Sequence, residues 1–63
     1  MIIVMNQAAT QADIEAVVER LKSVGSEAHV SVGQVQTVIG ALGDREAIRQ
    51  LPWEAMTGVE RAV

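Results

Sequence analysis

Short apolar segments and one longer amphipathic segment organise the chain. Four segments are short and rich in β-branched or other apolar residues, which predicts strands. These are residues 1–5 (MIIVM), 27–32 (EAHVSV), 35–42 (VQTVIGAL) and 59–63 (VERAV). The first is apolar throughout, a pattern typical of a central strand that is covered on both sides.

Residues 10–25 (TQADIEAVVERLKSVG) predict a helix. Thr10 suits the N-cap, and Asp13, three positions later, makes a short-armed variant of the capping box. Gly25 suits the left-handed stop at the other end. The apolar side chains fall at i, i+3, i+4 and i+7 and so share one face. They are Ile14, Val17, Val18 and Leu21.

A second helix is expected from Asp44, which can cap it, through about Leu51. Pro52 must end or restart this helix because it has no N–H to donate. One further turn is therefore expected in residues 52–56, before Gly58. The only aromatic residue, Trp53, either covers a helix end or anchors the domain to another one.

The order β, α, β, β, α, β in so short a chain predicts an α+β, ferredoxin-like domain that spans residues 1–63. Gly33 and Gln34 are expected to turn the hairpin between the second and third strands. Right-handed crossovers place the first and third strands in the middle of a four-stranded antiparallel sheet and both helices on one face. The other face is then bare, and a partner is expected to cover it.

Composition narrows the classes of function. A chain of 63 residues without cysteine has a small core and no disulfide, so we expect a homo-oligomer. The net charge of -3 and the scattered basic residues argue against nucleic acid as a partner. The apolar N-terminal run is too short for a signal peptide or a membrane span, so we expect a cytoplasmic protein without a membrane partner.

Few residues offer chemistry. A single histidine without cysteine lacks the ligands of a zinc site, and no serine lies in a nucleophile-elbow motif, so neither metal-binding nor catalytic residues are expected. Period-two geometry places His29 and Ser31 together on one strand face, as either solvated side chains or ligand contacts. Gly40, inside a predicted strand, suggests the close approach of another group.

A family resemblance favours ligand contact. MIIVM, ADIEAVVERLKSVG, AHVSVGQVQTVIGALGD and GVERAV together resemble the N-terminal ferredoxin-like (ACT-like) regulatory domain of 3-deoxy-D-arabino-heptulosonate 7-phosphate (DAHP) synthases. The branch in question places this domain before a TIM-barrel catalytic domain. The most specific part is HVSVGQVQTVIGALGD, with its histidine, serine, glycine, TVIG strand and GD pair.

The resemblance implies feedback control of the first step of the shikimate pathway to aromatic amino acids. It implies that tyrosine or phenylalanine binds where regulatory domains of different subunits meet, and that His29 and Ser31 are ligand contacts. Catalysis and its divalent metal would belong to the barrel of the parent enzyme, so this segment needs no cofactor. The alternative is a stand-alone dimerising module that binds no small molecule.

Overall fold

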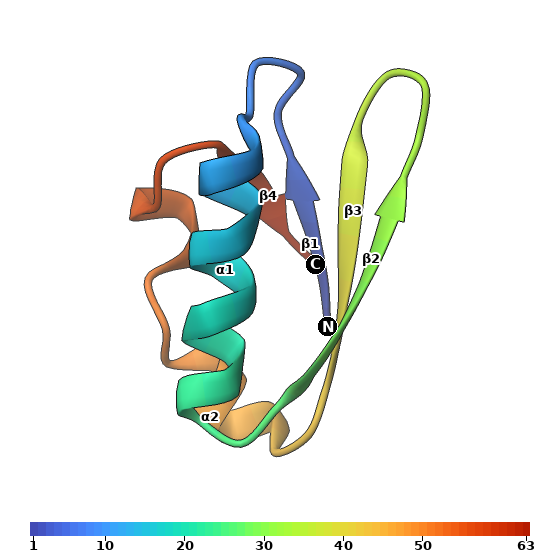
Figure 1. Ribbon diagram of the computed structural model, residues 1–63. Coiled ribbons are helices and arrows are strands. Elements are labelled where there is room, and N and C mark those ends of the chain that lie inside the picture. The colour runs from blue at the N-terminus through green and yellow to red at the C-terminus, as the bar shows by residue number, and fades with distance from the viewer.

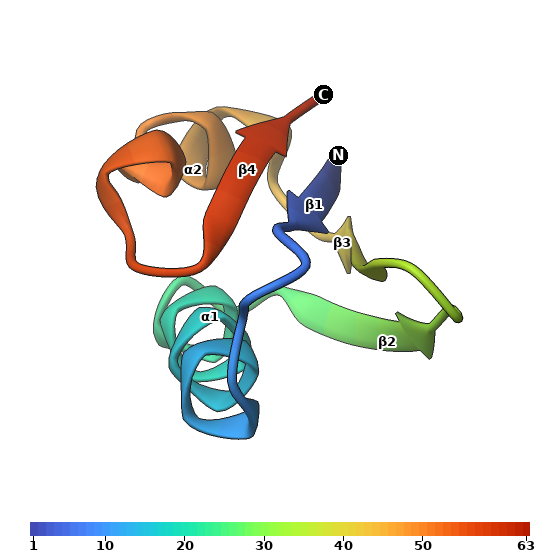
Figure 2. The same ribbon diagram turned by 90° about the horizontal axis from the view of Figure 1, so that it is seen from above.

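The structure, a computed structural model, describes residues 1–63 as one sheet with both helices on one face (Figures 1 and 2). The elements are β1 (Ile2–Met5), α1 (Gln11–Ser23), β2 (Glu27–Val32), β3 (Thr37–Leu42), α2 (Arg45–Arg49), a 3-10 turn (Trp53–Ala55) and β4 (Val59–Ala62). The sheet is antiparallel, with the order β2-β3-β1-β4. The predicted ferredoxin-like βαββαβ fold, with the first and third strands in the centre, is thus confirmed.

The predicted capping box begins α1. The Thr10 hydroxyl accepts a hydrogen bond from the Asp13 backbone N–H at 3.2 Å, and the Asp13 carboxylate accepts one from the Thr10 N–H at 3.0 Å. Gly25 follows the helix with φ +75°, as the left-handed stop requires. The buried side chains of α1 are Ile14, Val17 and Leu21, so its apolar face packs against the sheet.

The turn before β4 also depends on a glycine. Gly58 has φ +87°, and a Cβ atom at this position would lie 2.8 Å from the Cβ and Oδ2 atoms of Asp13. Two segments far apart in the sequence therefore meet at the N-terminus of α1. The turn before β4 could not lie so close to the start of α1 if residue 58 carried a side chain.

The second helix is shorter than predicted. Asp44 caps it by accepting from the N–H groups of Glu46 and Ala47, but α2 ends at Arg49 rather than near Leu51. A residue that precedes proline is disfavoured in the helical region, and Leu51 precedes Pro52, so the helix cannot readily include Leu51. The expected further turn is the 3-10 turn. Trp53 is 4% exposed and its indole N–H donates to the Ile48 carbonyl at 2.8 Å, so it covers the end of α2 within the domain.

The β2–β3 hairpin has a longer loop than Gly33 and Gln34 alone, and β3 begins at Thr37 rather than Val35. The Gly33 N–H donates to the Gln36 carbonyl at 3.1 Å, which leaves residues 34 and 35 at the tip. The Gln36 side chain turns back and donates to the Met5 carbonyl at 3.3 Å. This contact fixes the loop against β1.

The core lies between the sheet and the helices. Its buried apolar members include Ile3 and Met5 of β1 and Ile39 and Ala41 of β3. The turn end of the hairpin stands away from α1 (Figures 1 and 2), so Val32, although on the helix side of the sheet, is 78% exposed.

At the other side of the sheet, between β1 and the end of β4, Ile2 and Val63 exchange backbone hydrogen bonds of 2.9 and 2.8 Å and bring the chain ends together. No helix combines the length and the apolar character needed to cross a membrane.

Candidate functional site

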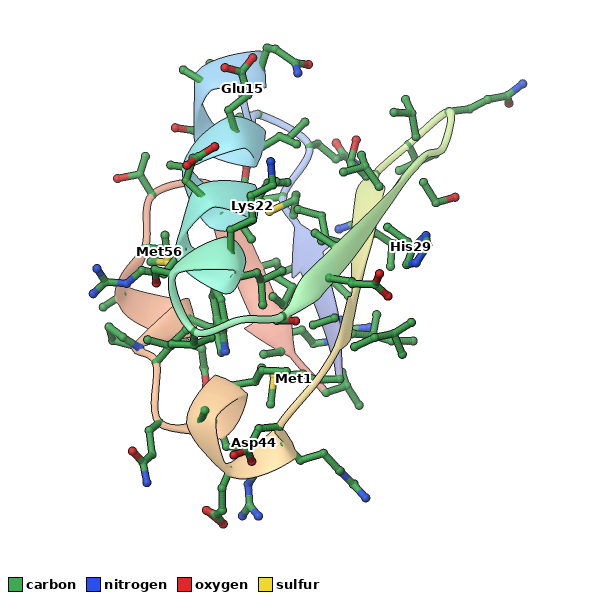
Figure 3. The ribbon with its side chains drawn as sticks, turned by 60° about the horizontal axis from the view of Figure 1, so that its bottom comes forward. Met1, Glu15, Lys22, His29, Asp44 and Met56 are labelled. Carbon is green, nitrogen blue, oxygen red and sulfur yellow. The ribbon has the colours of Figure 1, made fainter.

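The sheet face away from the helices, called the open face below, carries both residues that the sequence singled out. Figure 3 shows His29 projecting from this side, away from Glu15 and Lys22 of α1 and from Asp44, which caps α2. Strand register assigns the members of the face. They are Ile2, Val4, Glu27, His29, Ser31, Val38, Gly40, Leu42, Arg61 and Val63.

The register places His29 and Ser31 beside apolar residues of the central strands. His29 is paired with Gly40, which is paired in turn with Ile2. Ser31 is paired with Val38, which lies beside Val4. Both polar side chains are exposed, and neither makes a hydrogen bond within the chain. Their donors and acceptors are therefore free for another molecule.

Gly40 has no side chain, which leaves a gap on the open face between His29 of β2 and Ile2 of β1. A Cβ atom at this position would lie 3.9 Å from the nearest atoms, both of His29, so the close approach expected there is not made by any group of this chain. The gap is flanked by Ile2, which is 49% exposed, and Leu42, which is 57% exposed. The open face thus offers apolar surface around a gap, with imidazole and hydroxyl groups at its edge.

A cluster of three polar side chains, Gln36, Glu60 and Arg61, was not identified from the sequence. The Gln36 side-chain amide donates to Glu60 at 3.0 Å, and Arg61 pairs with the same carboxylate at 3.1 Å. Gln36 is distant in sequence from Glu60 and Arg61, and the β1–β4 register beside Glu60 shifts between Val4 and Met5. Such an irregularity gives no period-two signal. The neighbours Ile2 and Val38, in contrast, follow from the strand order once it is known.

The open face is not an enclosed pocket. The one hollow of measurable size, about 320 Å³, lies where β1 starts and β4 ends and does not involve His29 or Ser31. Its lining residues are Met1, Arg45, Arg49, Ala62 and Val63. No three histidine or acidic side chains lie close enough together to hold a metal ion. A small molecule bound beside His29 would therefore need a second surface to enclose it.

Comparisons with known proteins agree on one family. A family model described as the DAHP synthase ferredoxin-like domain matches residues 1–63. Phospho-2-dehydro-3-deoxyheptonate aldolase of Thermotoga maritima is 36% identical over 63 residues, which are 100% of this chain and 19% of that protein. The crystal structure of the Thermotoga maritima phospho-2-dehydro-3-deoxyheptonate aldolase (DAHP synthase) superposes with a TM-score of 0.82 at 35% identity. The match covers 95% of this chain and 18% of that one, so the chain spans about a fifth of these relatives.

Proposed function

Because the chain belongs to the family of DAHP synthase ferredoxin-like domains, we propose that it is a regulatory domain that binds tyrosine or phenylalanine. The bound amino acid would lie on the open face, with His29 and Ser31 as its polar contacts. The catalytic chemistry would belong to a barrel elsewhere in a longer protein, because this segment lacks a set of convergent reactive groups. We further propose that the complete enzyme is a cytoplasmic homo-oligomer whose barrel holds a divalent metal.

One observation carries the proposal: His29 and Ser31 lie on one face, exposed and without partners in the chain, beside uncovered apolar side chains. Imidazole and hydroxyl groups can each donate or accept a hydrogen bond, which suits a phenol or a zwitterionic head group. Ile2 and Leu42 offer the apolar contact that an aromatic ring needs. The gap at Gly40 leaves room for that ring against the backbone.

Feedback control of the complete enzyme would follow from the openness of the amino-acid site. A ligand on a bare sheet face keeps one side in water, whereas a regulatory domain of another subunit can enclose it. The ligand then binds the associated arrangement of domains more tightly and shifts the population toward it. We propose that this arrangement restricts access to the barrel. A ligand with equal affinity for both arrangements would shift nothing.

The test is calorimetric titration of this chain with tyrosine, phenylalanine and, as a control ligand, leucine. We expect His29→Ala and Ser31→Ala each to weaken binding by about 1–3 kcal/mol, the cost of leaving a polar partner unpaired. Ser23→Ala, at an exposed serine on α1, is the matched control and should leave affinity unchanged. In a complete enzyme the same two substitutions should weaken inhibition but preserve the uninhibited rate.

The two amino acids also report which ligand group the site recognises. If His29 and Ser31 hold the phenol hydroxyl, their removal should weaken tyrosine and leave phenylalanine unaffected. If they hold the head group, both amino acids should lose affinity alike. Wild-type affinity in both variants would refute the assignment, and dimerisation with no affinity for either amino acid would support the stand-alone module.

A further inference from the structure

The hollow at the start of β1 and the end of β4 is a positively charged region of an acidic domain. Its volume is about 320 Å³. The charged side chains that line it are Arg45 and Arg49 of α2, and apolar surface comes from Met1, Ala62 and Val63. None of the eight acidic residues of the chain lines the hollow, although the net charge is -3. The surroundings therefore favour a negatively charged ligand.

The two arginines are presented together by a helix that is fixed to the domain. Arg45 and Arg49 are four residues apart, so their side chains lie on the same face of α2. Between them Ile48 is buried in the core, and its carbonyl accepts a hydrogen bond from the Trp53 indole at 2.8 Å. The pair of guanidinium groups can thus act on one ligand.

The positive groups at the hollow have unused hydrogen-bond donors. Arg45 makes neither an ion pair nor a hydrogen bond within the chain. Arg49 pairs only with Glu46, at 3.6 Å, and the two side chains are 67% and 69% exposed, so the pair is weak. The Met1 ammonium group uses one of its three donors, in a hydrogen bond of 3.3 Å to the Ala41 carbonyl.

We infer that this hollow binds a small phosphate monoester that carries an apolar group. Guanidinium groups offer pairs of parallel N–H donors that match phosphate oxygens, and the two positive charges match a phosphate monoester of charge about -2. A single carboxylate would neutralise only one of them. The apolar group of the ligand would lie against Ala62 and Val63. The volume is near the lower end of the roughly 300–1,000 Å³ of small-molecule sites, which restricts the ligand to a small molecule.

A ligand in this hollow would connect α2 to the two ends of the chain. The Val63 backbone is already hydrogen-bonded to Ile2, so a molecule that contacts Arg45 and Val63 joins α2 to the β1–β4 pair. Such a ligand would stabilise the folded domain by mass action. The inference does not rest on the proposed function, because His29 and Ser31 take no part in the hollow.

Calorimetric titration of this chain with phenyl phosphate, inorganic phosphate and benzoate tests the site. We expect phenyl phosphate to bind most tightly, because only this probe supplies both the double charge and the apolar group. Arg45→Gln and Arg49→Gln should each weaken its binding by about three- to tenfold. Arg20→Gln is the matched control, because Arg20 of α1 is also exposed and without an ion pair. Absence of binding, or equal losses in Arg20→Gln and Arg45→Gln, would overturn the inference.

Two further variants separate a specific site from a general effect of net charge. Glu46→Gln frees Arg49 from its partner and should strengthen the binding of phenyl phosphate. Glu15→Gln removes the same charge from α1, where Glu15 has no ion pair, and should change affinity little. Equal gains in the two variants would show that the anion responds only to the net charge of the domain, which contradicts a site at the hollow.

Tyrosine titrations of the same variants distinguish this site from the proposed amino-acid site. Arg45→Gln should leave the urea midpoint of the unliganded chain and its affinity for tyrosine unchanged, and His29→Ala should leave affinity for phenyl phosphate unchanged. Binding of phenyl phosphate without binding of tyrosine would support the hollow and refute the amino-acid site. Binding of tyrosine alone would do the reverse. A loss of tyrosine affinity in Arg45→Gln would refute a separate site.

Discussion

Gly58→Ala should cost this domain most of its stability, because it affects the backbone of one segment and the packing of another. An alanine at φ +87° costs about 1–2 kcal/mol, the penalty of the left-handed region. Its Cβ would also lie 2.8 Å from the Cβ of Asp13, which is fixed to the helix backbone and cannot rotate away. Displacing Asp13 would break the capping box, worth about 1 kcal/mol.

The expected total of about 2–3 kcal/mol compares with roughly 3–5 kcal/mol for a core of this size. Urea unfolding followed by the fluorescence of Trp53, which is buried, should therefore show a large fall in the midpoint. Gly25→Ala is the matched control, because Gly25 has φ +75° but nothing within 4 Å of its added Cβ. Gly25→Ala should lower the free energy of unfolding only by the cost of placing an alanine in the left-handed region. Equal losses at the two glycines would show that the contact with Asp13 contributes nothing.

Two further substitutions test the helix face and the open face. Val17→Asp should unfold the domain, because it buries an unpaired charge at a fully buried position, whereas Glu15→Ala on the exposed side of α1 should change the midpoint little. Circular dichroism separates the two outcomes, and equal effects would refute the helix orientation. Gly40→Ala should leave stability unchanged or raise it by up to about 1 kcal/mol, since the added Cβ meets only ordinary contacts. The same change should weaken binding of tyrosine in calorimetry, and full affinity would show that the gap is not used.

Much of the fold could be predicted because its signals are local. The capping box of Thr10 and Asp13, the stop at Gly25 and the cap at Asp44 each act within a few residues, and all are present in the structure. The handedness of crossovers then determined the strand order. The hairpin turn was misplaced: the Gly33–Gln36 backbone hydrogen bond puts residues 34 and 35 at the tip, and the Gln36 side chain bonds Met5, which is far away in sequence. No local pattern reports such a contact.

The site was predicted less completely. Alternation along one strand was enough to place His29 and Ser31 on the open face. Their apolar neighbours come from β1 and β3, so they became members of the site only through the pairing of strands. The role of Gly40 differed from the expected one, because the close approach it permits is not made within this chain. A glycine in a strand signals available space but not what fills it.

The hydrogen bonds between Ile2 and Val63 have a consequence for the kinetics of folding. This pairing joins positions at opposite ends of the sequence, so nearly the whole chain must close into a loop before β4 can dock. The β2–β3 hairpin and α1 need only local contacts and can form earlier. Docking of β4 is thus expected late, and substitutions in it should speed unfolding more than they slow folding. A bound ligand or a partner that holds the sheet would in turn lengthen the lifetime of the folded state.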